Sequence, residues 1–149
     1  MATRDDKIAK LLLMYIYSGM RPIELLSIKL ENVHLDERYI IGGVKTKAGK
    51  DRIIPIADCV MPFYREIYAL AVASKSDTIP PGYTHKLLIT PIKRFCKEVG
   101  ISDYLPHDTR HTFITLVSNY GIDRYILKSI VGHTQSKDII VDVYTHKTI

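Results

Sequence analysis

The sequence predicts a mainly α-helical α+β fold with one small three-stranded antiparallel sheet, in a single domain that covers residues 1–149. Apolar residues recur at helical spacing in several segments, beginning with Ile8, Leu11 and Leu12. Short β-rich runs cluster between residues 33 and 56, where turn-forming residues separate them. Glycine and proline mark the ends of most segments, so the elements can be placed in order.

The first two predicted helices lie on either side of Gly19. Asp5 and Asp6 begin the first helix, because negative charge is favourable at a helix start, and Gly19 should end it. Pro22 lies in the first turn of the second helix, where its missing N–H would have no partner. Apolar residues up to Ile28 supply the buried side of this helix.

An antiparallel meander is predicted next, with strands at 33–35, 39–44 and 52–56. Residues 36–38 form its first turn, and the second turn contains Gly49. The second hairpin is strongly basic at its tip. Its cations are Lys45, Lys47, Lys50 and Arg52.

The second half of the chain is predicted to be helical. Residues 74–86 interrupt it as a loop or lid, because they contain several prolines, glycines and polar residues. Thr90 is the expected N-cap of the following helix, with Pro91 in its first turn. Asp123 is expected to cap a later helix that ends at Gly132. The predicted helices are 58–73, 91–99, 106–120, 124–131 and 138–144.

Composition and charge fit a globular protein whose partner carries phosphates. The chain is 46% hydrophobic and 25% charged, with a net charge of +5. Cys59 and Cys96 lie far apart and form neither a zinc motif nor a disulfide framework, so we expect two buried thiols in a reducing compartment. The apolar run at 11–17 is too short to span a membrane. We therefore expect a cytoplasmic protein that does not enter a membrane.

Candidate functional residues lie at helix starts, in the hairpin and after helix ends. His107 and Arg110 are three residues apart, so they share a helix face that could bind a phosphate or could simply be solvated. His111 points away from Arg110 and is expected to be structural. Arg21 could bind a ligand or pair with Glu24, and the other candidates also have ordinary structural roles. These other candidates are Lys45 or Lys47, His133 and Tyr144.

Five segments of the chain match motifs in a fixed order. Residues 19–25 read Gly-Met-Arg-Pro-Ile-Glu-Leu, residues 45–55 form a lysine hairpin, and residues 107–112 read His-Asp-Thr-Arg-His-Thr. Residues 131–133 read Val-Gly-His, and residues 144–146 read Tyr-Thr-His. Together they resemble the catalytic domain of the tyrosine recombinases, the phage integrase group. Each segment alone is weak evidence, but five in the same order are highly specific.

The resemblance implies a tyrosine recombinase fold and DNA cleavage without metal or cofactor, through a 3′-phosphotyrosine intermediate. The implied catalytic residues are Arg21, Lys45, His107, Arg110, His133 and Tyr144. The two arginines and His133 would hold phosphate oxygens, and Tyr144 would be the nucleophile. His107 would act as the base, and Lys45 would protonate the departing 5′ oxygen. The basic residues implied to contact DNA are Lys47, Lys50 and Arg52.

Three features depart from the commonest pattern of the family. The spacing from His133 to Tyr144 is two residues longer than usual, which a loop can absorb. Thr109 stands where leucine is frequent. Lys45 is favoured as the catalytic lysine because it opens a Lys-Thr pair, but Lys47 remains an alternative, since the two share a strand face.

Two other functions remain open beside a site-specific recombinase or integrase. One is a type IB topoisomerase-like enzyme that relaxes supercoils without a defined site, and the other is a DNA-binding module that has lost catalysis. The resemblance implies double-stranded DNA as the partner, a homotetramer on DNA and accessory DNA-bending proteins. Family members carry DNA-binding domains before the catalytic one, so residues 1–149 are expected to be an excised catalytic domain.

Overall fold

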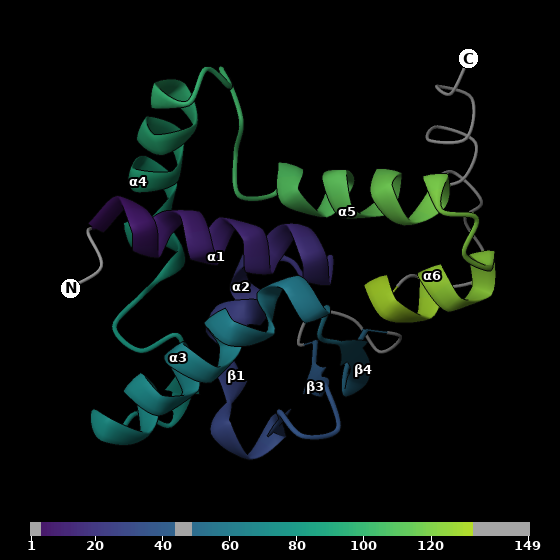
Figure 1. The fold of residues 1–149 in the computed structure, drawn as a ribbon, viewed down its shortest axis with the longest axis horizontal. Helices are drawn as coiled ribbons and strands as arrows, with labels where there is room; N and C mark the ends of the chain where they lie inside the picture. Colours follow the sequence, from purple (N-terminus) through teal and green to yellow (C-terminus); the bar gives the residue numbers. More distant parts are fainter. Residues whose placement is uncertain (1–3, 44–48, 133–149) are drawn as a thin grey trace.

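The computed structural model describes residues 4–43 and 49–132, and Figure 1 shows how they are arranged. The helices are α1 (Arg4–Ser18), α2 (Pro22–Leu26), α3 (Met61–Ala73), α4 (His85–Glu98), α5 (Asp108–Asn119) and α6 (Arg124–Val131). The strands are β1 (Ile28–Lys29), β2 (Val33–His34), β3 (Tyr39–Gly42), β4 (Arg52–Pro55) and β5 (Thr78–Ile79). Two short 3-10 turns are η1 (Leu30–Asn32) and η2 (Asp58–Val60). The predicted mainly helical α+β fold is confirmed.

Helix α1 lies at the centre of the described molecule, because α3, α4 and α5 all pack against it (Figure 1). Its apolar stripe includes Leu11 and Tyr15, which are buried. The Tyr15 hydroxyl donates a hydrogen bond to the Pro22 carbonyl at 2.8 Å and so joins α1 to α2. The helix ends at Ser18, and Gly19 follows with φ +65°, as the sequence predicts.

The predicted meander is confirmed, with strand order β2–β3–β4 and antiparallel pairing throughout. Ile40 pairs with Ile54, and both side chains are fully buried, so one face of this sheet covers the core. A second sheet pairs β1 with β5, with Ile28 opposite Ile79. The prediction of a helix at Ile28 is therefore wrong, and the loop predicted at 74–86 contains a strand.

The start of α4 also differs from the sequence prediction. Thr84 caps this helix, because its hydroxyl oxygen accepts a hydrogen bond from the Leu87 N–H at 3.4 Å. Pro91 lies inside this helix, so the prediction that Thr90 is its N-cap is wrong. Proline in a helix interior removes one hydrogen bond and is normally unfavourable. Pro91 is buried, so packing against the core offsets part of this cost.

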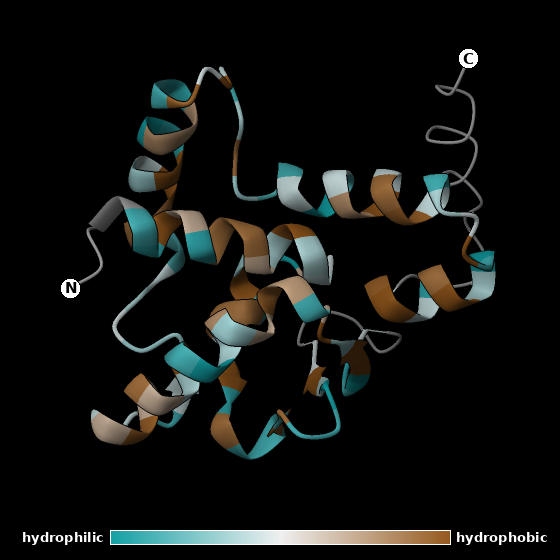
Figure 2. Cartoon of the chain, in the orientation of Figure 1, coloured by the Kyte–Doolittle hydropathy of each residue, from teal (hydrophilic) through white to brown (hydrophobic). Residues whose placement is uncertain are grey.

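Helices α5 and α6 form a second apolar cluster beside the main core (Figure 1). Phe113 of α5 and Leu127 of α6 are among its buried residues. The limits of α6 agree with the prediction: the Asp123 carboxylate accepts hydrogen bonds from the N–H groups of Tyr125 and Ile126 at 2.8 and 3.2 Å. Figure 2 shows hydrophobic residues along α6, and Ile126 and Tyr125 of this helix are exposed.

The two cysteines differ in burial. Cys96 of α4 is buried as expected, but Cys59 is exposed, so the prediction of two buried thiols is wrong for Cys59. Cys59 lies in the turn η2 rather than on the buried face of a helix, which explains the difference. Within the described ranges, no helix is long and apolar enough to cross a membrane.

Candidate functional site

The first turn of α5 is held in place by two side chains of its own. Thr109 is fully buried, and its hydroxyl donates to the Pro106 carbonyl at 2.6 Å. The Asp108 carboxylate accepts a hydrogen bond from the Leu105 N–H at 2.7 Å. Thr109 therefore has a structural role that leucine could not perform, because leucine has no donor for this carbonyl.

Arg110 is a buried cation that connects three distant segments. Only 3% of its surface is exposed, and its guanidinium donates to the carbonyls of Gly19 at 2.8 Å and of Val131. Burial, together with the charges of Arg21 and Arg52, lowers the pKa of Arg110 to about 10, while the charge of Glu24 opposes the shift. Arg110 is still protonated at neutral pH, and its two hydrogen bonds use two of its five N–H donors.

Arg21 lies at the N-cap of α2 and pairs with Glu24, one of the two roles considered from the sequence. Its guanidinium donates to Glu24 Oε1 at 3.0 Å, and its backbone N–H donates to Glu24 Oε2 at 2.8 Å. The Arg21 side chain keeps 18% of its surface exposed. The Arg21 side chain is therefore not closed off from solvent.

The sequence did not identify Glu24 as the centre of this site. Its side chain has no exposed surface, and Arg52 Nη2 donates to Glu24 Oε2 at 2.7 Å. Burial raises the pKa of Glu24, but the hydrogen bonds from Arg52 and the Arg21 N–H, together with both cationic charges, bring it below its usual value. The available signal was the capping box, in which the residue three positions after an N-cap is Glu.

Arg52 lies in a different environment from the one the sequence predicts. The basic hairpin suggests an exposed contact with DNA, yet Arg52 is 6% exposed. Besides Glu24, its guanidinium bonds the carbonyls of Ile130 at 2.6 Å and of Gly49 at 2.7 Å. Arg52 is therefore a buried connection between segments and not the exposed cation that the basic hairpin suggests, and its contact with DNA stays a prediction. Lys50, in the adjacent turn, is exposed.

His107 and His111 lie side by side at the start of α5. Their rings meet edge to face, with 5.4 Å between centroids. Burial lowers the pKa of His107, and the charges of His111, Arg110 and Arg21 lower it further, against the opposing effect of Asp108. A lowered pKa keeps the His107 imidazole neutral, which is the form that can accept a proton.

Four predicted site residues, Lys45, Lys47, His133 and Tyr144, lie outside the described residues. Of the remaining predicted catalytic residues, Arg110 bonds the Gly19 carbonyl, two residues before Arg21, and the charges of both arginines lower the pKa of His107. In the same described portion, no group of three acidic, histidine or cysteine side chains could hold a metal ion.

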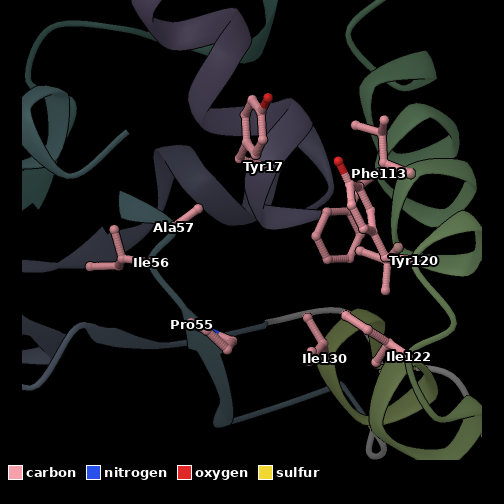
Figure 3. A pocket seen from close by; sticks show the side chains of 10 residues that line it. Tyr17, Pro55, Ile56, Ala57, Phe113, Tyr120, Ile122 and Ile130 are labelled. Atoms are coloured by element: carbon pink, nitrogen blue, oxygen red, sulfur yellow. The ribbon is translucent and has the colours of Figure 1, made fainter. Parts of the chain in front are cut away.

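Residues of α1, β4, α5 and α6 line an apolar pocket (Figure 3). Tyr17 of α1, Pro55 of β4, Phe113 of α5 and Ile130 of α6 contribute to its wall, and Tyr120 lies beside Phe113. No charged residue lines this pocket. Its chemistry therefore suits an apolar side chain and not a phosphate.

Curated relatives and solved structures extend this description. The XerA tyrosine recombinase of Pyrococcus horikoshii is 30% identical over 158 residues, covering 97% of this chain and 52% of that protein. The XerA enzyme of Saccharolobus solfataricus is 33% identical over 144 residues, covering 97% of this chain and 46% of that protein. The chain thus spans about half the length of the curated relatives it matches.

Solved structures show the same fold. A crystal structure of XerA recombinase has a TM-score of 0.69 at 22% identity and covers 100% of this chain and 65% of that one. The Tn1549 transposon integrase in complex with transposon right end DNA has a TM-score of 0.76 at 20% identity, covering 99% of this chain and 57% of that one. The family model described as "Phage integrase family" matches residues 2–149. On this evidence the chain belongs to the phage integrase family of tyrosine recombinases.

Proposed function

We propose that residues 1–149 form the catalytic domain of a site-specific DNA recombinase, which cuts and rejoins DNA through a 3′-phosphotyrosine intermediate. The observation that carries the proposal is the meeting of Arg21 and Arg110. Arg110 bonds the Gly19 carbonyl, two residues before Arg21, and the charge of Arg21 lowers the pKa of Arg110. The two positive charges oppose each other, and an anion such as a phosphodiester would relieve this repulsion.

The proposed reaction gives each residue one task. The guanidinium groups of Arg21 and Arg110, with His133, hold the non-bridging oxygens of the phosphate. Each such donor contributes about 10²- to 10³-fold to the rate. Tyr144 Oη attacks the phosphorus while His107 accepts its proton. The bond from phosphorus to the 5′ oxygen breaks, and Lys45 protonates that oxygen. The phosphotyrosine retains the bond energy, so a second strand can be joined without ATP.

The relatives support DNA as the substrate. The curated proteins are named tyrosine recombinases, the Tn1549 integrase is described in complex with transposon right end DNA, and a XerH site-specific recombinase is described bound to its difH substrate. We extend this to a homotetramer on double-stranded DNA, with accessory DNA-bending proteins, in the cytoplasm. Lys47 and Lys50 would contact the DNA backbone, so binding should weaken as salt rises.

A library of nicked DNA duplexes with random sequence around the nick tests the proposal. Cleavage beside a nick releases a short strand, which prevents rejoining and leaves the protein joined to DNA. The covalent products are isolated in denaturing detergent, and their DNA is sequenced. A single enriched motif supports a site-specific recombinase.

The other outcomes distinguish the alternatives. Covalent products without a shared motif would favour a type IB topoisomerase-like enzyme. DNA binding without covalent products would favour a module that has lost catalysis. The matched control is Tyr144→Phe, which removes only the hydroxyl; a covalent product from this variant would show that Tyr144 is not the nucleophile.

A further inference from the structure

Two side chains of α5 hold the chain immediately before His107. Thr109 Oγ1 donates to the Pro106 carbonyl at 2.6 Å, and Asp108 Oδ2 accepts from the Leu105 N–H at 2.7 Å. The Asp108 N–H also donates to the Leu105 carbonyl at 2.9 Å. His107 is the N-cap of α5, so these bonds hold the backbone on both sides of it.

A third side-chain bond holds the same turn one residue further back. Thr112 Oγ1 donates to the Asp108 carbonyl at 3.1 Å, so the Tyr104 hydroxyl, 2.6 Å away, is the donor to Thr112. The turn of residues 104–106 is thus bonded to α5 at each of its positions. Thr109 is fully buried, so water cannot replace its bond to the turn if the hydroxyl is removed.

The guanidinium group of Arg110 is held from other segments of the chain. It donates to the Gly19 carbonyl at 2.8 Å and to the Val131 carbonyl, and neither bond involves the turn. The His107 imidazole instead projects from the N-cap itself and meets the His111 ring edge to face, with 5.4 Å between centroids. A loosened turn would therefore shift the imidazole of His107 more than the guanidinium of Arg110.

We propose that Thr109 is a positioning residue for the base His107, and that it acts by fixing the turn from which the imidazole projects. The inference rests on the proposed function. In that reaction the hydroxyl proton of Tyr144 passes to the imidazole as Oη bonds to phosphorus. The electron pair of the broken bond leaves on the 5′ oxygen, which takes its proton from Lys45. A displacement of about 1 Å at a catalytic group can cost about 10²-fold in rate, so a hydrogen bond beside His107 can control the rate without touching DNA.

A double-mutant cycle separates an effect through His107 from a general loss of structure. Single-turnover formation of the covalent product on the selected nicked duplex is measured for the unchanged chain, Thr109→Val, His107→Ala and the double variant. Valine keeps the shape of threonine but has no donor for the Pro106 carbonyl. We expect Thr109→Val alone to lower the rate about 10-fold. In the His107→Ala background the same substitution should change the rate by less than about twofold, because no imidazole is left to position.

A conservative variant and a second hydroxyl of α5 provide the controls. Thr109→Ser keeps the donor, so its rate should lie within about threefold of the unchanged chain. Thr115→Val removes a hydroxyl that donates to the His111 carbonyl at 3.0 Å, a bond within α5 that does not reach the turn, and should leave the rate unchanged. The Kd for the duplex should stay within about twofold in Thr109→Val, because Arg110 keeps both of its bonds. Circular dichroism and the melting temperature establish that each variant is folded; if Thr109→Val is not, Thr109→Ala is measured in the same way.

Two failures can be told apart. Equal rate losses from Thr109→Val in the two backgrounds, or an equal loss in Thr109→Ser, would overturn the role of Thr109 and leave the proposed function intact. If His107→Ala forms too little product to measure, the cycle is run with His107→Gln. No covalent product from the unchanged chain would overturn the proposed function, and the role of Thr109 with it.

Discussion

The Glu24→Gln substitution removes a buried negative charge and keeps the shape of the side chain. Glu24 has no exposed side-chain surface and accepts hydrogen bonds from Arg52 Nη2 at 2.7 Å and from the Arg21 N–H at 2.8 Å. Removing one partner of a buried ion pair costs about 3–5 kcal/mol. Because glutamine keeps one acceptor oxygen, we expect the lower figure, a loss of about 3 kcal/mol in the free energy of unfolding.

Urea and thermal unfolding measure this loss. In a domain of this size each kcal/mol shifts the melting temperature by about 2–4 °C, so the expected shift is about 6–12 °C. The urea midpoint should fall while the slope stays the same, because the native fold is kept. The matched control is Asp58→Asn, in the pair of Asp58 with Arg38, where both side chains are exposed and the expected loss is below about 1 kcal/mol. If Glu24→Gln lowered the free energy of unfolding by less than about 1 kcal/mol, the stabilising role of the buried Glu24–Arg52 pair would be refuted.

The pH dependence gives a second, independent test of Glu24. Hydrogen bonds and cationic charges hold its pKa below the usual value, despite burial. Such a group stabilises the fold at pH values above the pKa of the unfolded chain, about 4.3, and this stabilisation is lost as pH falls through the lower folded pKa. The difference between the unchanged chain and Glu24→Gln should therefore be complete at neutral pH and shrink in acid. A difference that stays constant into strong acid would contradict the ionised state of Glu24.

Three further predictions concern the elements around the site. Gly19→Ala should lower stability by at least about 2 kcal/mol, because Gly19 has φ +65° and a Cβ there would lie 2.3 Å from the Phe113 ring; thermal melting measures this. Thr109→Val should cost about 1–2 kcal/mol in urea unfolding, because it leaves a buried carbonyl without its donor, whereas Thr109→Ser should cost less. His111→Gln should raise the pKa of His107 by removing a neighbouring charge, and so move the acid limb of the cleavage rate to higher pH; an unmoved limb would count against His107 as the base.

Local signals made much of the fold predictable. The Asp123 cap and Gly132 defined α6, and Gly19 marked the end of α1, because capping and left-handed turns depend on neighbouring residues alone. The meander was predictable for the same reason, since its strands are consecutive and its turns are short.

Long-range contacts account for what the sequence did not predict. Ile28 pairs with Ile79, and neither residue carries a local signal for a partner so far along the chain. Pro91 lies within α4 because the helix starts earlier and core packing outweighs its local preference. Arg52 was expected on the surface because its neighbours are basic, but the buried partner, Glu24, is 28 residues away.

The charges of the buried network explain how the cationic site can form before DNA binds. The guanidinium groups of Arg21 and Arg52 bond Glu24, and Arg110 lies close enough for all three to influence its pKa. Three positive charges and one negative charge leave a net charge of +2 in this cluster. A phosphodiester carries one negative charge, and attack by a phenolate brings the transition state to two. In the proposed reaction, this positive cluster would stabilise the negative charge that develops at the phosphate as Tyr144 attacks, which is the condition for electrostatic catalysis.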